Sequence, residues 1–336
     1  MKKAGNPLAK RSRTASLVSS QPFIAFVVMV LLYLLFFILS PNFRTINVFT
    51  QILDAAYYLG FLAIGVTFVI ATGGIDLSLG TVMITSALIG GRLFTIHGLP
   101  IWVAIIATIL IAVLFNIING YLVAYLSLPA FIATLGVQMI STGFGQIWTE
   151  RLNTTWPSTT GAEGGAFRML FKVSVRTDAG IINIPTGLIL LVIASIIMGV
   201  VLRKTRTGRY ILALGSNYEA TRLSGINVRK YMMLSYIING FFVGIGAVAF
   251  AATYSAILPG TGTGQELNAI AGVVIGGTSL NGGIASIPGT IFGIMLMAIL
   301  KVGLPKVGMQ PEWQTLITGL IILAAVMLDI ARNKKK

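Results

Sequence analysis

The sequence predicts an all-α polytopic membrane protein with about ten transmembrane helices, some of them broken, and with both termini in the cytoplasm. Only 10% of the 336 residues are charged and 56% are hydrophobic, and the mean hydropathy is +0.90. A soluble domain carries roughly 25% charged residues, so a globule of this composition would aggregate in water. Uncharged stretches about as long as a bilayer crossing recur along the chain.

The composition also excludes several kinds of chemistry. The chain has no Cys and a single His, His97, which excludes thiol catalysis, cysteine-ligated metals and the paired-histidine zinc site. No G-x-x-x-x-G-K-[ST] motif occurs, so the chain does not hydrolyse ATP through a P-loop. We therefore expect no catalytic residue, no metal and no cofactor in this chain.

The gaps between charged residues place the expected helices. A spanning helix needs about 20 mostly apolar residues. The first stretch follows a basic N-terminal segment and has no cleavage site after it, so we expect an uncleaved helix. The ten expected helices are residues 23–39, 55–75, 81–94, 102–126, 131–148, 186–202, 232–257, 267–278, 287–300 and 313–328.

The positions of the basic residues predict the orientation, because an excess of Lys and Arg marks cytoplasmic segments. Of the 24 Lys and Arg residues, 16 fall in residues 1–22, 203–230 and 332–336. We expect these segments in the cytoplasm, the transmembrane domain over 23–331, and the polar loop 150–185 on the periplasmic side. The net charge of +15 then reflects orientation, with basic loops that face anionic lipid or a partner, and not nucleic-acid binding.

The segment TGGIDLSLG, residues 72–80, interrupts apolar sequence with a carboxylate. An acid at the middle of a bilayer costs at least ~2.5 kcal/mol, so Asp76 must face protein or water. Two glycines weaken a helix here, and Asp76 or Ser78 can cap a new one. Two interpretations stay open: an interrupted helix that, with Thr72, lines a transport path, or a capped loop at the membrane surface.

The segment GSNYEATRLSGI, residues 215–226, predicts a short helix that cannot span the membrane. Ser216 and Glu219 have capping-box spacing, and Gly225 stands where such a helix ends. The helix is about two turns long, at 3.6 residues per turn, and has basic flanks. From the residues alone it either lies in the membrane interface, which they favour, or docks on a soluble partner.

A third segment, residues 265–283, carries uncharged hydrogen-bonding side chains that suit a neutral polyol. Gly272 and Gly276 form a GxxxG pattern, which favours close helix packing. Its GGTSLNGG matches GGIDLSLG of residues 73–80, through an internal repeat or by chance. The polar residues of this segment are Asn268, Thr278, Ser279 and Asn281.

Other polar side chains lie within the apolar stretches. They either line a path or bond neighbouring helices, and for any single residue we favour the second. These residues are Asn116, Asn119, Thr134, Gln138, Gln146 and Asn239.

In order and spacing, four segments resemble one family, the permease subunits of bacterial ATP-binding-cassette importers for simple sugars. This is the ribose permease type within the branched-chain amino acid and sugar permease superfamily, and the similarity spans about residues 41–329. The segments are VIATGGIDLSLG (69–80), LPAFIATLG (128–136), RKTRTGRYILALGSNYEATRLSGINV (203–228) and ELNAIAGVVIGGTSLNGG (266–283).

The resemblance implies a homodimer or heterodimer of permeases in the bacterial inner membrane, with an ATPase on the cytoplasmic face and a periplasmic solute-binding protein. ATP and Mg²⁺ would be bound by the partner ATPase. By this likeness residues 216–225 form the coupling helix that docks on the ATPase, which reverses the preference for the interface. The coupling residues are Ser216, Asn217, Glu219, Ala220, Arg222, Leu223 and Gly225, and the expected solute-path residues are Thr72, Asp76, Ser78, Asn116, Asn119, Gln138, Asn268, Thr278 and Asn281.

We expect the chain to pass a neutral polyhydroxylated solute inward by alternating access, with no chemistry on the solute. Members of the family carry ribose, other pentoses and hexoses, furanoses, inositol and a furanosyl signalling molecule, and nucleoside permeases are more distant. Asn268 stands where the family commonly has an acid, and the loop 150–184 diverges, so the particular sugar stays open.

The alternatives are a nucleoside or furanosyl-signal permease, an ion-coupled secondary transporter and a membrane enzyme. Ion coupling is disfavoured because only Asp76 is a plausible ionisable group within the membrane. An enzyme is disfavoured by the missing Cys and the single His.

Overall fold

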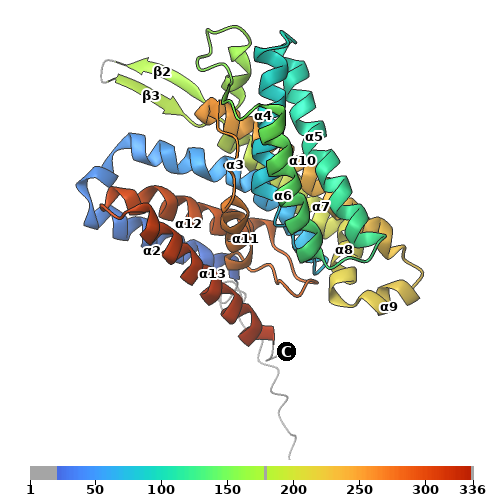
Figure 1. Ribbon diagram of the computed structural model, residues 1–336. Helices are drawn as coiled ribbons and strands as arrows, with labels where there is room; N and C mark the ends of the chain where they lie inside the picture. The colour runs from blue at the N-terminus through green and yellow to red at the C-terminus, as the bar shows by residue number, and fades with distance from the viewer. Residues whose placement is uncertain (1–20, 178–179, 334–336) are drawn as a thin grey trace, which may run out of the picture.

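The computed structural model describes residues 21–177 and 180–333 and is built mainly of helices (Figure 1). Each of the ten expected stretches is helical, which confirms the all-α membrane fold. Most of the two predicted tails lies outside the described residues. In chain order the ten helices are α2 (Gln21–Leu39), α3 (Ile46–Ala71), α4 (Leu79–Thr95), α5 (Ile101–Ala124), α6 (Ala130–Trp148), α7 (Gly187–Lys204), α10 (Val228–Tyr254), α11 (Gln265–Ile275), α12 (Ile287–Lys306) and α13 (Pro311–Asn333).

Among the described residues, seven helices are long and apolar enough to cross a membrane. Three shorter apolar helical segments accompany them: Leu79–Thr95, Gln265–Ile275 and Glu312–Ala324. At ~1.5 Å per residue, α11 is about 16 Å long and cannot cross a hydrocarbon core of about 30 Å. It is a half-helix, as the short, glycine-broken eighth stretch predicted.

The helices are organised around α3, which is almost entirely buried and packs against α10 and α12. The outer helices α2, α5, α6, α7 and α13 expose large apolar side chains, among them Ile38, Leu110, Ile140, Ile196 and Met327. Such a surface aggregates in water but suits contact with lipid tails. The distribution of burial therefore supports a multi-pass membrane protein.

Helices α11 and α12 cross at two glycine pairs. A Cβ atom on Gly293 would lie 1.9 Å from the carbonyl oxygen of Gly272, and one on Gly289 would lie 1.8 Å from that of Gly276. Backbones approach this closely only where neither residue has a side chain. Gly272 and Gly276 therefore pack two helices together, as their spacing predicted.

The segment between α6 and α7 is more ordered than the expected polar loop. Trp156 is buried there, and its Nε1 donates to the carbonyl oxygen of Ala87 on α4 at 2.9 Å. Strands this short carry too little periodicity to be found in sequence. The short elements are η1 (Pro41–Arg44), which joins α2 to α3, η2 (Gly165–Leu170), the antiparallel hairpin β2 (Val173–Thr177) and β3 (Gly180–Ile184), and β1 (Thr154–Thr155), which pairs antiparallel with β4 (Ala256–Ile257).

Two connecting segments lie at opposite ends of the helix bundle (Figure 1). The β2–β3 hairpin is at one end, and α8 (Arg206–Ser216) and α9 (Tyr218–Leu223) are at the other. The basic stretch 203–230 is therefore gathered at the end formed by α8 and α9. Its assignment to the cytoplasm rests on the charge bias and stays a prediction.

Gly293→Ala should loosen the α11–α12 crossing, because the new Cβ atom meets a backbone oxygen and not a flexible side chain. Overpacking of this kind costs ~1–3 kcal/mol. We expect a lower Tm in detergent by thermal unfolding. Gly143→Ala in α6, where a Cβ atom meets open space, is the matched control and should keep the parent Tm. Equal Tm values for the two variants would show that this crossing does not hold α11 in place.

Candidate functional site

Asp76 lies in the break between α3 and α4, in the interior of the protein. Thr72 ends α3, and its Oγ1 donates to the carbonyl oxygen of Val69 at 2.7 Å. Asp76 is fully buried, and its Oδ1 accepts from the Ser78 backbone N–H at 2.8 Å and from Ser78 Oγ at 2.6 Å. The carboxylate thus bonds the residue before α4, but neither Asp76 nor Ser78 makes a side-chain cap bond to that helix. The expected capped loop at the surface is therefore wrong, and Asp76 lies in a buried break.

Three asparagines from α5 and α10 surround this carboxylate. Asn239 donates from Nδ2 to Asp76 Oδ2 at 2.7 Å and to Asn116 Oδ1 at 2.9 Å. Asn119 donates to Ser78 Oγ at 2.8 Å and to Asp76 Oδ1 at 3.4 Å. All three asparagines are fully buried. Amide donors therefore take the place of water around a charge whose burial would otherwise cost several kcal/mol.

Helix α6 also bonds to the break between α3 and α4. Thr134 accepts at its Oγ1 from the backbone N–H of Leu77 at 3.1 Å. Asn116, Asn119, Thr134 and Asn239 thus bond neighbouring segments in this conformation, which is the favoured interpretation for each of them.

A second break, residues 276–286 between α11 and α12, lies directly beside the first. The backbone N–H of Gly283 donates to the carbonyl oxygen of Ala71 at 3.0 Å. A Cβ atom on Gly73 would lie 3.5 Å from the carbonyl oxygen of Asn281. The two segments whose sequences match each other therefore meet in space.

Gly215, near the end of α8, packs closely against both breaks. A Cβ atom here would lie 2.0 Å from the carbonyl oxygen of Ala71 and 2.6 Å from the backbone nitrogen of Gly283. A Cβ atom on Gly282 would lie 2.8 Å from the Cα atom of Gly215. We call this meeting of Gly215 with Ala71 and with Gly282 and Gly283 the break junction. Backbones packed this closely leave no free space between the end of α8 and the two breaks.

The caps of α9 differ from the prediction. Asn217 Oδ1 accepts from the backbone N–H of Ala220 at 2.9 Å, so Asn217 is the N-cap. Ser216, the predicted cap, is the last residue of α8. Glu219 pairs with Arg222 at 2.8 Å and does not return to the helix start. The capping-box prediction is wrong, because α8 runs up to Ser216 and leaves only Asn217 with the extended backbone of a cap.

The predicted coupling residues form an exposed face on α9. The side chains of Glu219 and Arg222 are 63% and 57% exposed, and Leu223 is 78% exposed. Gly225 follows the helix with a φ of +81°, which suits its predicted place at the helix end.

Glu266 belongs to the polar interior, although the expected helix 267–278 begins only after it. Its Oε1 accepts from the Gly264 backbone N–H at 2.8 Å and from Gln138 Nε2 at 3.3 Å, while Oε2 has no hydrogen-bond partner among the described residues. A Cβ atom on Gly80 would lie 2.7 Å from that Oε2 and 2.1 Å from the carbonyl oxygen of Gly262. The starts of α4 and α11 therefore meet beside a buried carboxylate, as half-helices do at transporter binding sites.

Asp76 is not the only buried or half-buried ionisable group among the described residues. Asp54 on α3 is buried and pairs with Lys172 at 2.9 Å. Lys301 on α12 donates to Gln265 Oε1 at 3.2 Å. A charge bounds the expected helices 55–75, 267–278 and 287–300, so the prediction leaves Asp54, Glu266 and Lys301 in loops.

The predicted solute-path residues fall into separate groups in this conformation. Asp76, Ser78, Asn116 and Asn119 share one cluster, and Gln138 contacts Glu266. Asn268 lies at a cleft of about 410 Å³ between α11, α12 and α13, together with Lys301 and Gln314. Thr72, Thr278 and Asn281 lie in the two breaks, where Thr278 Oγ1 accepts from the Ser286 backbone N–H at 3.2 Å.

A bundle of apolar helices interrupted at buried polar groups is the architecture of a membrane transport protein. Residues 48–326 match the family described as the branched-chain amino acid transport system / permease component. The chain belongs to this family, which confirms the predicted resemblance. It is a permease component of a transport system and not itself an enzyme.

Similar proteins include several sugar import permeases. The chain is 36% identical over 300 residues to the ribose import permease protein RbsC of Escherichia coli (strain K12), covering 89% of each chain. It is 31% identical over 312 residues to the fructose import permease protein FrcC of Rhizobium meliloti, covering 93% of this chain and 86% of that one. It is 32% identical over 326 residues to the galactose/methyl galactoside import permease protein MglC of Haemophilus influenzae (strain ATCC 51907 / DSM 11121 / KW20 / Rd), covering 91% and 94%.

Asp76→Ala should destabilise the protein by ~2–4 kcal/mol, because the buried donors of Ser78, Asn119 and Asn239 lose their acceptor. The measurement is the Tm of the purified protein in detergent. Asp76→Asn keeps an acceptor oxygen, so its Tm should fall less than that of Asp76→Ala. Glu163→Ala removes an exposed acid and should leave Tm unchanged. If Asp76→Ala melts like Glu163→Ala, the asparagine cluster does not depend on the carboxylate.

Gly215→Ala should open the break junction, because no room exists for a Cβ atom beside Ala71 and Gly283. We expect faster hydrogen exchange at the Gly283 amide, which donates to Ala71, measured by mass spectrometry of peptides from residues 276–286. Gly136→Ala, on α6 with nothing near its Cβ position, should leave that exchange unchanged. Unaltered exchange in Gly215→Ala would refute the close contact.

Proposed function

We propose that this chain is the transmembrane permease of an ATP-binding-cassette importer that brings a monosaccharide or a similar neutral polyol across the bacterial inner membrane. The similar proteins are import permeases for ribose, fructose and galactose. Hydroxyl-rich solutes need uncharged donors and acceptors, and the amides of Gln138 and Asn268 near the half-helix α11 supply such groups. This combination favours a sugar over an ionic solute.

The break junction is the observation that carries the mechanism. α9 lies at one end of the bundle and follows Gly215, the second-last residue of α8, after only two residues (Figure 1). Gly215 touches the breaks that hold Asp76 and Thr278. An ATPase that docks on α9 would therefore move α8 and, through it, both breaks. Alternating access then consists of repacking the segments around these breaks.

The proposal assigns the remaining parts to partners. ATP and Mg²⁺ would be bound by the cytoplasmic ATPase, and a periplasmic solute-binding protein would deliver the sugar at the end that carries β2 and β3. A second copy of the permease or a paralogue would complete the membrane unit. No step of chemistry on the solute is assigned to this chain.

An ion-coupled secondary transporter is a second candidate, favoured by the buried carboxylates. Asp76 and Glu266 lie inside the helix bundle, and Glu266 has one oxygen without a hydrogen-bond partner among the described residues. Acids in such positions serve as proton relays in pumps and transporters.

Reconstitution separates the two candidates. We expect proteoliposomes that hold the permease with its ATPase and binding protein to take up labelled sugar only when ATP is supplied on the ATPase side. Uptake by the permease alone, driven by a proton gradient, would overturn the importer and favour the secondary transporter.

Arg222→Ala and Glu219→Ala should each reduce ATP-driven uptake by about tenfold, the equivalent of ~1.4 kcal/mol of docking energy. Both side chains are exposed, and exposed ion pairs add little to folding, so a loss reports on docking. Sugar affinity of the binding protein should not change. Lys230→Ala, an exposed basic position at the start of α10, is the control. Parent uptake rates in both α9 variants would remove the coupling role.

A further inference from the structure

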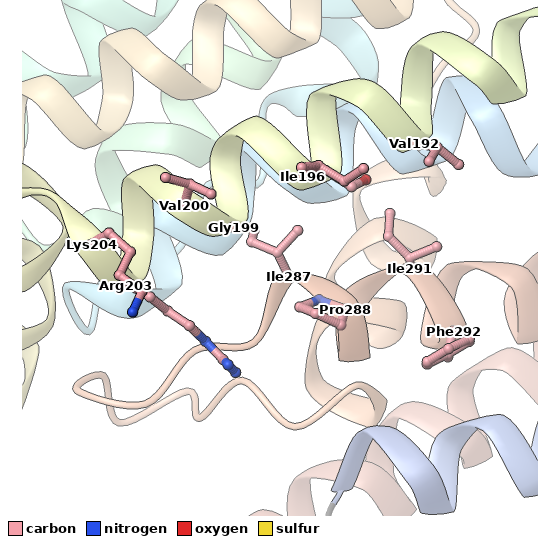
Figure 2. A pocket seen from close by; sticks show the side chains of 11 residues that line it. Val192, Ile196, Gly199, Val200, Arg203, Lys204, Ile287, Pro288, Ile291 and Phe292 are labelled. Atoms are coloured by element: carbon pink, nitrogen blue, oxygen red, sulfur yellow. The ribbon is translucent and has the colours of Figure 1, made fainter.

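A groove runs between α7 and α12, outside the site described above (Figure 2). It has a volume of about 420 Å³. One row on α7, formed by Val192, Ile196, Gly199 and Val200, faces Ile287 and Ile291 at the start of α12. Ser195, which also lines it, donates from Oγ to the carbonyl oxygen of Leu191 at 2.6 Å on its own helix. The groove is therefore apolar along its length.

Two cations lie together at one end of this groove. Arg203 and Lys204 belong to the last turn of α7, and Figure 2 shows them at the same end. Both are exposed, and no ion pair joins either to an acidic side chain among the described residues. An apolar channel that ends in two unpaired cations is complementary to a molecule with an apolar tail and an anionic head.

Gly199 leaves space that the protein does not fill. A Cβ atom added there would meet a single neighbour, the Cβ of Ile287 at 4.0 Å. At Gly60 the situation is the reverse, because a Cβ atom would lie 2.6 Å from Leu191 on the same helix α7. Gly60 is needed for α7 to pack on α3, whereas Gly199 is not needed for α7 to pack on α12.

The length of the groove matches one leaflet of a bilayer. From Val192 to Arg203, α7 rises about 16 Å at ~1.5 Å per residue. Half of a hydrocarbon core of about 30 Å is about 15 Å. A chain that starts from a phosphate at Arg203 would therefore stay within a single leaflet.

We propose that the α7–α12 groove binds one anionic phospholipid, with its phosphate on Arg203 and Lys204 and an acyl chain along Gly199 and Ile291. The excess of Lys and Arg on one side of a membrane protein accounts for the side on which these cations lie. It does not account for an unfilled apolar groove that leads away from them. The lipid site goes beyond transport and does not rest on the solute or on the ATPase.

The test is lipid binding to the purified full-length permease by native mass spectrometry, with phosphatidylglycerol as the anionic probe and phosphatidylethanolamine as the zwitterionic one. The parent protein should bind phosphatidylglycerol more tightly than phosphatidylethanolamine. Arg203→Gln with Lys204→Gln should weaken that binding about 30-fold, because each basic residue near a membrane surface contributes a separate attraction to anionic lipid. Gly199→Leu should block the groove and reduce binding of phosphatidylglycerol by at least tenfold.

The controls match charge and size. Arg229→Gln with Lys230→Gln removes two exposed cations at the start of α10, and Gly199→Ala adds a single methyl group; both should bind phosphatidylglycerol like the parent. The proposal would be overturned if both double variants lost phosphatidylglycerol binding equally. It would also be overturned if Arg203→Gln with Lys204→Gln bound phosphatidylglycerol as tightly as the parent protein. The charge pair is exposed and leaves packing intact, so it decides the question even if Gly199→Leu does not fold. A change of oligomeric mass in Gly199→Leu without a change in lipid binding would instead make the groove an interface between copies and overturn the lipid site.

Discussion

The buried carboxylate of Asp76 is the constraint on which the rest of the membrane domain depends. The bilayer interior offers no water, so the charge needs amide donors from neighbouring helices. Those amides reach it only where backbones come close. A Cβ atom on Gly65 would lie 2.7 Å from Asn239 Oδ1, and one on Gly240 would lie 2.6 Å from the Cβ of Asn116. The polar cluster therefore forms only because glycines allow α3, α5 and α10 to pack closely.

The same logic explains the two breaks. A continuous helix satisfies its own backbone and has no need of neighbours, whereas a broken one leaves N–H and C=O groups that other segments must pair. Here the pairing is partly mutual, since Gly283 of the second break donates to Ala71 at the edge of the first. Gly215 then brings the end of α8 against both. The backbone contacts of the two breaks thus include the end of α8, and α9 follows it in the chain.

Charges at the periphery serve a different purpose from those inside. The interior acids Asp54, Asp76 and Glu266 accept from protein donors, whereas Arg203 and Lys204 lie exposed at the end of an outer helix. Each interior acid has at least one protein donor, because an unmatched charge there costs several kcal/mol. Outer groups are left for the surroundings, whether a lipid headgroup or a soluble subunit.

The sequence by itself determined the fold class, the ten helical stretches, the break at Asp76, the glycine crossing of α11 and the family, because each depends on local composition, spacing or motif. Only the tertiary structure decided which charges are buried. Glu266 borders a loop in the sequence, yet α11 carries it into the interior, and Lys301 of α12 is half-buried at a cleft. It also decided that Asn217 and not Ser216 caps α9, and that both breaks meet Gly215. These outcomes depend on contacts between residues far apart in the chain, which no local pattern records.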